Sequence, residues 1–152
     1  MRRVLVALLL PSVTRWIDIQ ERLILAEGTA LDERGIADAR RIGVSNPERV
    51  RLLRVAKIPL PVGTFVASFG RWFGVTSGNF AGLTARYGIY VRTDLWGDRH
   101  LIAHELAHTA QYERFGGVRP FLRQYLSECL TTGYSGAALE LEAIEAAAMA
   151  CS

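Results

Sequence analysis

Two histidines and a glutamate occupy positions from which they could act together on one metal ion. His104 and His108 are four residues apart, so on an α-helix their imidazoles lie one turn from each other on the same face. Glu105 points about 100° away from His104 around the helix and can reach a water on such an ion rather than the ion itself. The spacing therefore predicts a two-histidine metal site in which Glu105 acts as a general base.

The residues around this motif are apolar on nearly all sides of the expected helix, which spans residues 98–115. Two histidines and a glutamate in a buried helix are costly unless they are paired or bind a ligand. The alternative interpretation is that both histidines are core residues that bond to the backbone and to Glu105. The helix is expected to begin with Asp98 as its N-cap and to end at Gly116.

A catalytic zinc ion needs a third protein ligand and an open position for water. No histidine follows His108, so the third ligand must be a glutamate or a cysteine. Gln111 and Arg114 occupy positions where the metzincin pattern needs a glycine and a third histidine, so that pattern fails. The downstream candidates are Glu113, Glu128, Cys129, Glu140, Glu142 and Glu145.

Two other residues of the motif helix are badly placed to complete the site. Glu113 is nine residues past His104 and faces away from it around the helix. His100 is two turns from His108, about 12 Å along the helix axis, and is expected to be an exposed residue of the first turn.

The remaining candidates follow the motif helix. Glu128 and Cys129 belong to the next expected helix, most simply as a solvent-facing acid and a packed thiol. Glu140 and Glu142 are left, on a separate helix expected over residues 137–150.

The motif, taken together with residues 134–143 (Tyr-Ser-Gly-Ala-Ala-Leu-Glu-Leu-Glu-Ala), resembles the small gluzincin metallopeptidases, particularly the bacterial DUF4157-like domains. The resemblance covers residues 84–148 and is slight before them. It implies a zinc ion bound by His104, His108 and Glu140.

The resemblance also implies an alternative ligand and a departure from the family pattern. Glu142 is the alternative third ligand. Such families often carry an aspartate four residues after the ligand glutamate, where it orients a zinc-binding histidine, and this chain has Ile144 there. A missing partner of this kind typically costs about 10- to 100-fold in metal affinity or activity.

The resemblance further implies how a substrate would bind and react. The strand over residues 87–92 would be an edge strand that pairs with an extended peptide. Zinc would acidify a water and polarise the scissile carbonyl, while Glu105 takes the proton and returns it to the leaving amine. The expected donor to the oxyanion is Tyr134, with Tyr112 and Tyr90 as alternatives.

The composition is that of one folded domain. Half of the 152 residues are apolar, 22% are charged, and the formal net charge is +3. The arginines alternate with acids at helical spacings, which argues against nucleic-acid binding. Cys129 and Cys151 cannot form a disulfide framework. We expect a single metallopeptidase-like domain over residues 1–152, with its catalytic core over residues 84–150.

The chain begins with two arginines and an apolar run over residues 4–10, which Pro11 is expected to close. Seven residues cannot span a bilayer, which needs about 20. No cleavage site typical of a secretory signal follows, so we expect a cytoplasmic protein rather than a secreted one. Residues 1–27 are expected to form an apolar, amphipathic helix in the core or at an interface, and residues 2–25 could associate with a membrane surface.

The periodicity of apolar residues predicts an α+β fold. We expect a helix-rich, gluzincin-like core of about six helices, with a small two- or three-stranded sheet next to the active-site helix. Helices are expected over residues 14–27, 32–42, 65–73, 98–115, 120–130 and 137–150, and strands over residues 50–58 and 84–92, the latter with a tight hairpin around 86–88 as the alternative. The expected inward side chains of the first two helices are Trp16, Ile19, Leu23, Ala26, Ile36, Ala39 and Ile42. Asp38 is expected to point outward.

These patterns favour a zinc-dependent metallopeptidase that acts on a peptide or protein substrate. The alternative is a catalytically inactive, peptidase-like module that binds metal or peptides, or assembles with a partner.

Overall fold

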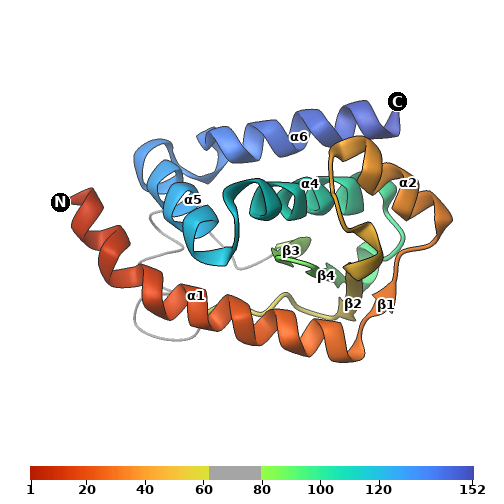
Figure 1. Ribbon diagram of the computed structural model, residues 1–152, viewed down its shortest axis with the longest axis horizontal. Helices are drawn as coiled ribbons and strands as arrows, with labels where there is room; N and C mark the ends of the chain where they lie inside the picture. Colours follow the sequence, from red (N-terminus) through yellow and green to blue (C-terminus); the bar gives the residue numbers. More distant parts are fainter. Residues whose placement is uncertain (62–79) are drawn as a thin grey trace.

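The computed structural model describes residues 1–61 and 80–152, which form an α+β structure (Figure 1). Within these residues, five α-helices surround a small four-stranded sheet. The helices are α1 (Arg2–Glu27), α2 (Glu33–Ile42), α4 (Arg99–Phe115), α5 (Val118–Thr132) and α6 (Ala138–Cys151). The strands are β1 (Thr29–Ala30), β2 (Arg51–Val55), β3 (Gly82–Ala85) and β4 (Gly88–Arg92). The short 3₁₀ turns are η1 (Pro47–Arg49), η2 (Thr93–Leu95) and η3 (Tyr134–Gly136).

The described elements lie close to where the sequence predicts them. The Asp98 carboxylate caps α4 by accepting a hydrogen bond from Leu101 N at 2.9 Å. The same helix ends at Gly116, whose φ of 87° is in the left-handed region that favours glycine. The helix expected over residues 65–73 lies outside the described residues. The sheet has one strand more than expected, because the two-residue strand β1 is too short to give a sequence pattern.

The sheet has the order β1-β2-β4-β3, with β2 and β4 parallel and the other pairs antiparallel. The alternative of a hairpin is confirmed, since β3 and β4 are joined by a turn in which Arg86 has a φ of 58°. The expectation that residues 87–92 form an edge strand is wrong, because β4 lies between β2 and β3. Its residues Ile89 and Val91 are fully buried, as is usual for a strand paired on both sides. The edge strand that contacts α4 is β3.

The first helix, α1, is continuous and contains Pro11, where the apolar run was expected to end. A proline inside a helix removes one backbone hydrogen bond. Leu10 before it and Ile17 after it are buried in the same core, and this packing keeps the two halves in one helix. In the described part of the chain, no helix is both long enough and apolar enough to cross a membrane.

The predicted inward face of α1 is confirmed at Trp16, which packs against the hydrophobic core, and is wrong at Ile19, Leu23 and Ala26. Ile19 and Leu23 are 43% and 47% exposed, and the buried face carries Gln20 and Ile24 instead. Gln20 is tolerated there because its Oε1 accepts a hydrogen bond from the Tyr90 hydroxyl at 2.7 Å. Helical periodicity cannot reveal such a partner on a distant strand.

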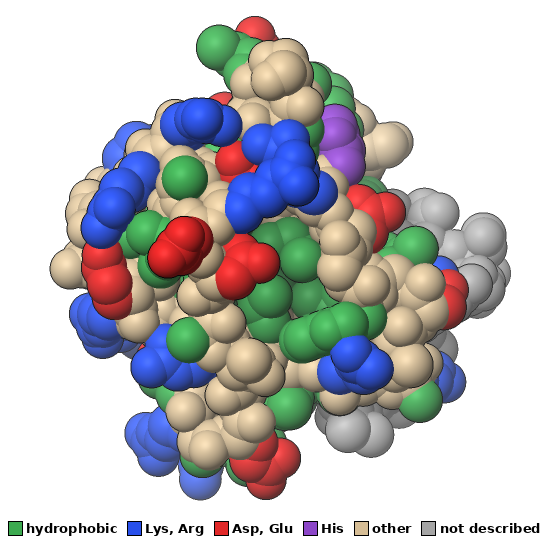
Figure 2. Space-filling view, turned by 90° about the vertical axis from the view of Figure 1, so that its right-hand side faces the viewer, with side chains coloured by type: hydrophobic (Ala, Val, Ile, Leu, Met, Phe, Trp, Pro, Cys, Tyr) green, Lys and Arg blue, Asp and Glu red, His purple; other side chains and the backbone are tan. Residues whose placement is uncertain are grey.

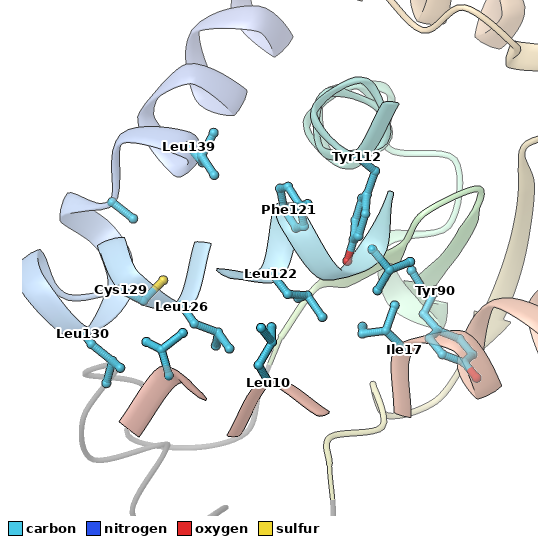
Figure 3. Close-up of a cluster of buried hydrophobic side chains, with 14 of the residues drawn as sticks. Leu10, Ile17, Tyr90, Tyr112, Phe121, Leu122, Leu126, Cys129, Leu130 and Leu139 are labelled. Carbon is cyan, nitrogen blue, oxygen red and sulfur yellow. The ribbon is translucent and has the colours of Figure 1, made fainter. Parts of the chain in front are cut away.

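Helix α4 lies between two hydrophobic cores. The core shown in Figure 3 combines side chains of α1, α4, α5, α6 and the sheet, and here the Tyr112 and Phe121 rings have centroids 4.0 Å apart. The second core lies between α2, the sheet and α4, and it contains Leu106. Cys129 is buried in the first core, as expected of a packed thiol, and burial raises its pKa to about 12.

Asp38 connects α2 to α4 and is buried, contrary to the sequence prediction. Its carboxylate accepts hydrogen bonds from Arg99 Nε at 2.8 Å and Nη2 at 2.9 Å. The same Nη2 donates to the carbonyl of Ala150 at 3.1 Å, so one arginine joins α2, α4 and the end of α6. The hydrogen bonds from Arg99 hold the pKa of Asp38 below its usual value despite its burial.

Other charged pairs of α2 lie at the surface. Arg40 Nη2 is 2.7 Å from Glu48 Oε1, and both side chains are well exposed. On the face shown in Figure 2, basic and acidic side chains lie next to one another around a hollow with a hydrophobic floor. Surface pairs of this kind contribute little to stability, so the Asp38 pair is the stronger link.

We expect Asp38→Asn to lower the free energy of unfolding by about 2 kcal/mol at neutral pH, because Arg99 loses a charged partner. Since folding lowers the pKa of Asp38, its contribution is present above the unfolded-state pKa of about 4 and is lost as the pH falls below that value. Urea unfolding of wild type and variant at neutral pH and at about pH 3 checks this, and the difference between them should shrink at the lower pH.

The matched control is Glu48→Gln, which removes the exposed partner of Arg40 and should change stability by less than about 1 kcal/mol. A difference between wild type and Asp38→Asn that is the same at both pH values would contradict the assigned role of Asp38.

Candidate metal centre

The first two residues of the site come from α4. His104 and His108 lie on one face of this helix, with ring centroids 4.9 Å apart and Nε2 atoms 3.2 Å apart. His108 is buried and His104 is partly exposed. The capped ends of α4 and the cores on its two sides fix the helix, so both rings are presented from a rigid element.

Glu140 reaches the histidines from the first turn of α6. Its Oε2 is 3.1 Å from His104 Nε2, and its Oε1 is 3.1 Å from His108 Nε2. Only 2% of Glu140 is exposed. These three residues offer ligand atoms that lie within 4.8 Å of one another, and they are the only such group in the described residues.

Electrostatics keeps this cluster charged and paired. Burial alone would raise the pKa of Glu140, but hydrogen bonds from His104 and His108 outweigh it and hold the pKa well below its usual range. Burial likewise opposes the charged form of His108, but the Glu140 carboxylate raises the pKa of this imidazole to about 9. Charge-assisted hydrogen bonds therefore hold the three side chains together.

The donor set and its spacing fit a metal ion. Two imidazole nitrogens and a carboxylate oxygen are ligands shared by several transition-metal ions. Around a tetrahedral ion with bonds of about 2.0–2.1 Å, neighbouring ligand atoms lie about 3.3 Å apart. The His104–His108 Nε2 separation of 3.2 Å agrees with this value, and each imidazole lies 3.1 Å from a different oxygen of Glu140. The cluster can therefore hold one metal ion with little movement.

Glu142, the alternative ligand, points away from the cluster. Its carboxylate accepts two hydrogen bonds from Arg114, at 2.7 and 3.0 Å, on the exposed side of α6. Of the two candidates that the sequence leaves open, only Glu140 lies beside the histidines. His100 and Glu145 are exposed and take no part.

The other acidic candidates have structural partners. Glu113 faces away from the histidines, as predicted, and accepts hydrogen bonds from Ser45 N and from the Tyr87 hydroxyl, each at 2.7 Å. Glu128 is more than a solvent-facing acid, because it accepts a hydrogen bond from Leu139 N at 2.9 Å and so caps the start of α6.

Gln111 orients His108 in the way expected of the missing aspartate. Its Oε1 is 2.8 Å from His108 Nδ1, and its Nε2 donates to the carbonyl of Leu139 at 2.9 Å. A carboxamide oxygen only accepts, so Nδ1 carries the proton and Nε2 is left to face Glu140. The expectation that the site lacks an orienting partner is therefore wrong. Ile144, where an aspartate was expected, is 51% exposed on the outer side of α6.

Tyr125 of α5 belongs to the site and was missed in the sequence. Its hydroxyl donates a hydrogen bond to Glu140 Oε1 at 2.6 Å, and its ring stands edge-on to His108. Burial and the Glu140 carboxylate raise the pKa of Tyr125, so it remains a donor. The only sequence signal is the four-residue spacing from Phe121, on which its ring stacks. That spacing predicts a packed tyrosine rather than a contact with a ligand residue.

The edge strand β3 holds Glu105. The Thr84 hydroxyl lies 2.6 Å from Glu105 Oε2 and 3.0 Å from the backbone carbonyl of the same residue. At Gly82 a Cβ atom would lie 2.9 Å from Glu105 Oε1, so any other residue there would force this carboxylate to shift. Glu105 thus contacts the sheet edge from the position next to His104 on α4.

Tyr134 lies in η3, directly before α6, with its ring edge-on to Phe80. Burial, together with the carboxylates of Glu140 and Glu105, raises its pKa. Tyr134 therefore lies beside the candidate site and keeps its proton at neutral pH.

The two alternative tyrosines, Tyr112 and Tyr90, are buried in a hydrophobic core, and both hydroxyls have hydrogen-bond partners there. Tyr112 is fully buried and donates its hydroxyl hydrogen bond to the carbonyl of Thr84 at 3.2 Å. The Tyr90 hydroxyl is bonded to Gln20, as described above. Neither hydroxyl points to the histidines, so Tyr134 remains the candidate donor.

No family model, curated protein or solved structure matches this chain. The likeness to gluzincins therefore stays a prediction, and the function of the site has to be inferred from its own residues.

Proposed function

We propose that this protein is a zinc-dependent peptidase whose metal ligands are His104, His108 and Glu140. The observation that carries the proposal is the convergence of these three side chains from two helices, with Glu105 next to the first of them. Two histidines and a glutamate leave a fourth position open, which is the arrangement of catalytic rather than structural zinc sites.

Each residue around the ligands has its own role in the proposed amide hydrolysis. A bound zinc ion supplies Lewis acidity, which acidifies a water and polarises a carbonyl. In this proposal, Glu105 accepts a proton from the attacking water and returns it to the leaving amine. Thr84 holds the Glu105 carboxylate in place, and Tyr134 is the candidate donor to the oxyanion.

The edge strand supports a peptide or protein as the substrate. β3 has one side unpaired within the described sheet, and it runs directly beside Glu105. An extended peptide can add to such an edge through backbone hydrogen bonds. The Tyr112 hydroxyl already occupies the carbonyl of Thr84, so pairing would use the part of the strand that precedes this residue.

We expect the purified protein to bind about one zinc ion per chain, and Glu140→Gln to abolish this binding because a neutral amide is a poor ligand. Glu142→Gln is the matched control, since it alters an exposed carboxylate two residues away and should keep the metal. Metal analysis after dialysis, together with thermal unfolding of each variant, checks both. Equal metal loss in the two variants would contradict the ligand assignment.

Glu105→Gln should retain zinc and lose peptide hydrolysis by about 10²- to 10⁴-fold, because the amide cannot accept the proton. Cleavage of a broad peptide library measures the activity, and metal analysis of the same samples shows that the site is intact.

Two outcomes separate the proposal from its alternative. Cleavage that disappears in Glu105→Gln supports the enzyme. A zinc-loaded wild type that is as inert as the variant would instead indicate an inactive module that binds metal or peptide.

Gln111→Leu should weaken zinc binding by about 10- to 100-fold, because His108 loses the acceptor that fixes its ring. Gln111→Glu keeps an acceptor at the same place and should retain most of the affinity. Competition with a chelator measures both values, and unfolding of the metal-free variants separates loss of affinity from loss of fold. If the two variants bind zinc equally well, Gln111 does not position His108.

A further inference from the structure

The outward side of α1 carries an apolar stripe that the described structure leaves uncovered. Val4 and Leu8 are 61% and 70% exposed, and Ile19 and Leu23 are 43% and 47% exposed. Separations of four and eleven residues place these side chains on one face of the helix. This outer stripe, defined by these four residues, lies opposite the face that packs on α5 and the sheet.

Basic side chains accompany the outer stripe. Arg2, Arg3, Arg15 and Arg22 are exposed, and among the described residues none of them has an ion-pair partner. The first acid of the helix is Asp18, so the N-terminal part of α1 carries positive charge alone.

Arg15 and Arg22 lie on the same side as the outer stripe, at seven and fourteen residues from Leu8. Asp18 lies near this side as well, three residues from Arg15 and four from Arg22, and is partly buried. The Glu21 carboxylate is turned inward, where it accepts a hydrogen bond from Tyr87 N at 3.0 Å. The exposed side of the helix thus combines apolar side chains with an excess of basic over acidic ones.

We propose that α1 attaches this protein to an anionic lipid surface, lying in the plane of the membrane with the outer stripe in the headgroup region. Apolar side chains flanked by unpaired arginines are what an interfacial helix needs, because the apolar atoms leave water while the guanidinium groups meet lipid phosphates. The described helices are not suited to crossing the bilayer, so the attachment is to one surface.

The outward side of α6 shows that exposure of apolar residues alone does not define such a surface. Leu141 and Met149 are 52% and 71% exposed, but their charged neighbours are the acids Glu142 and Glu145. An acidic surface is repelled by anionic lipid. Leu141 and Met149 therefore serve as control positions. They are about as exposed as Leu23 and Leu8, but their charged neighbours are acidic rather than basic.

Flotation of the full chain with lipid vesicles tests the proposal. We expect binding to vesicles of phosphatidylcholine with phosphatidylserine and little binding to phosphatidylcholine alone. Arg15→Gln with Arg22→Gln should weaken binding about 25-fold, at about fivefold for each charge. Leu8→Gln with Leu23→Gln should weaken it at least about tenfold. The controls Leu141→Gln with Met149→Gln, and Arg34→Gln on α2, should bind like wild type.

Three results would overturn the proposal. The first is no binding to either vesicle by the folded wild type. The second is binding that the α1 variants and the α6 controls weaken equally. The third is a dimer in analytical ultracentrifugation that the Leu8 and Leu23 substitutions dissociate, which would assign the outer stripe to a second copy of this chain. All substituted positions are exposed, and thermal unfolding confirms that each variant remains folded.

Discussion

Glu140 carries a negative charge into a part of the protein where only 2% of the residue is exposed. Removing a carboxylate from water costs several kcal/mol, so its partners must be in place whenever α6 lies on α4. His104, His108 and Tyr125 supply these partners from α4 and α5. A slip of α6 by one turn, about 5 Å, would leave the charge unpaired, and the site therefore fixes the register between the helices as much as the helices fix the site.

The remainder of the structure holds α6 in that register from both ends. At its start, the carbonyl of Leu139 accepts a hydrogen bond from Gln111, and the amide of the same residue donates to Glu128. At its other end, the carbonyl of Ala150 accepts a hydrogen bond from Arg99, which Asp38 holds in place. The amide of Leu139 and the carbonyl of Ala150 are groups that the helix itself leaves unpaired. A short, alanine-rich helix is thereby positioned well enough to present the candidate metal ligand Glu140.

The sequence predicts the parts of this arrangement that depend on local chemistry. Helix α4 and its histidine pair follow from the Asp98 cap and a spacing of four residues, and most element boundaries are close to those expected. The contacts of Tyr125 with Glu140 and of Thr84 with Glu105 join residues 15 and 21 positions apart, and no periodicity encodes them. The buried position of Asp38 depends on an arginine 61 residues later, and the central place of β4 depends on its pairing with β2. Glu140 is predictable only in part. The composition limits the third ligand to a few residues, and the fold brings one of them to the histidines.

Gln111 gives His108 the hydrogen-bond acceptor that an aspartate at position 144 was expected to provide. A carboxylate beside His108 would place a second negative charge next to Glu140 in a buried region, and both would have to be neutralised by the imidazoles or by a metal ion. A carboxamide accepts the same Nδ1 hydrogen bond and adds no charge, so a 2+ ion bound there would keep more of its Lewis acidity. The other half of the amide bonds to Leu139, directly before Glu140. One neutral side chain therefore sets both the orientation of an imidazole and the position of the helix that carries the carboxylate.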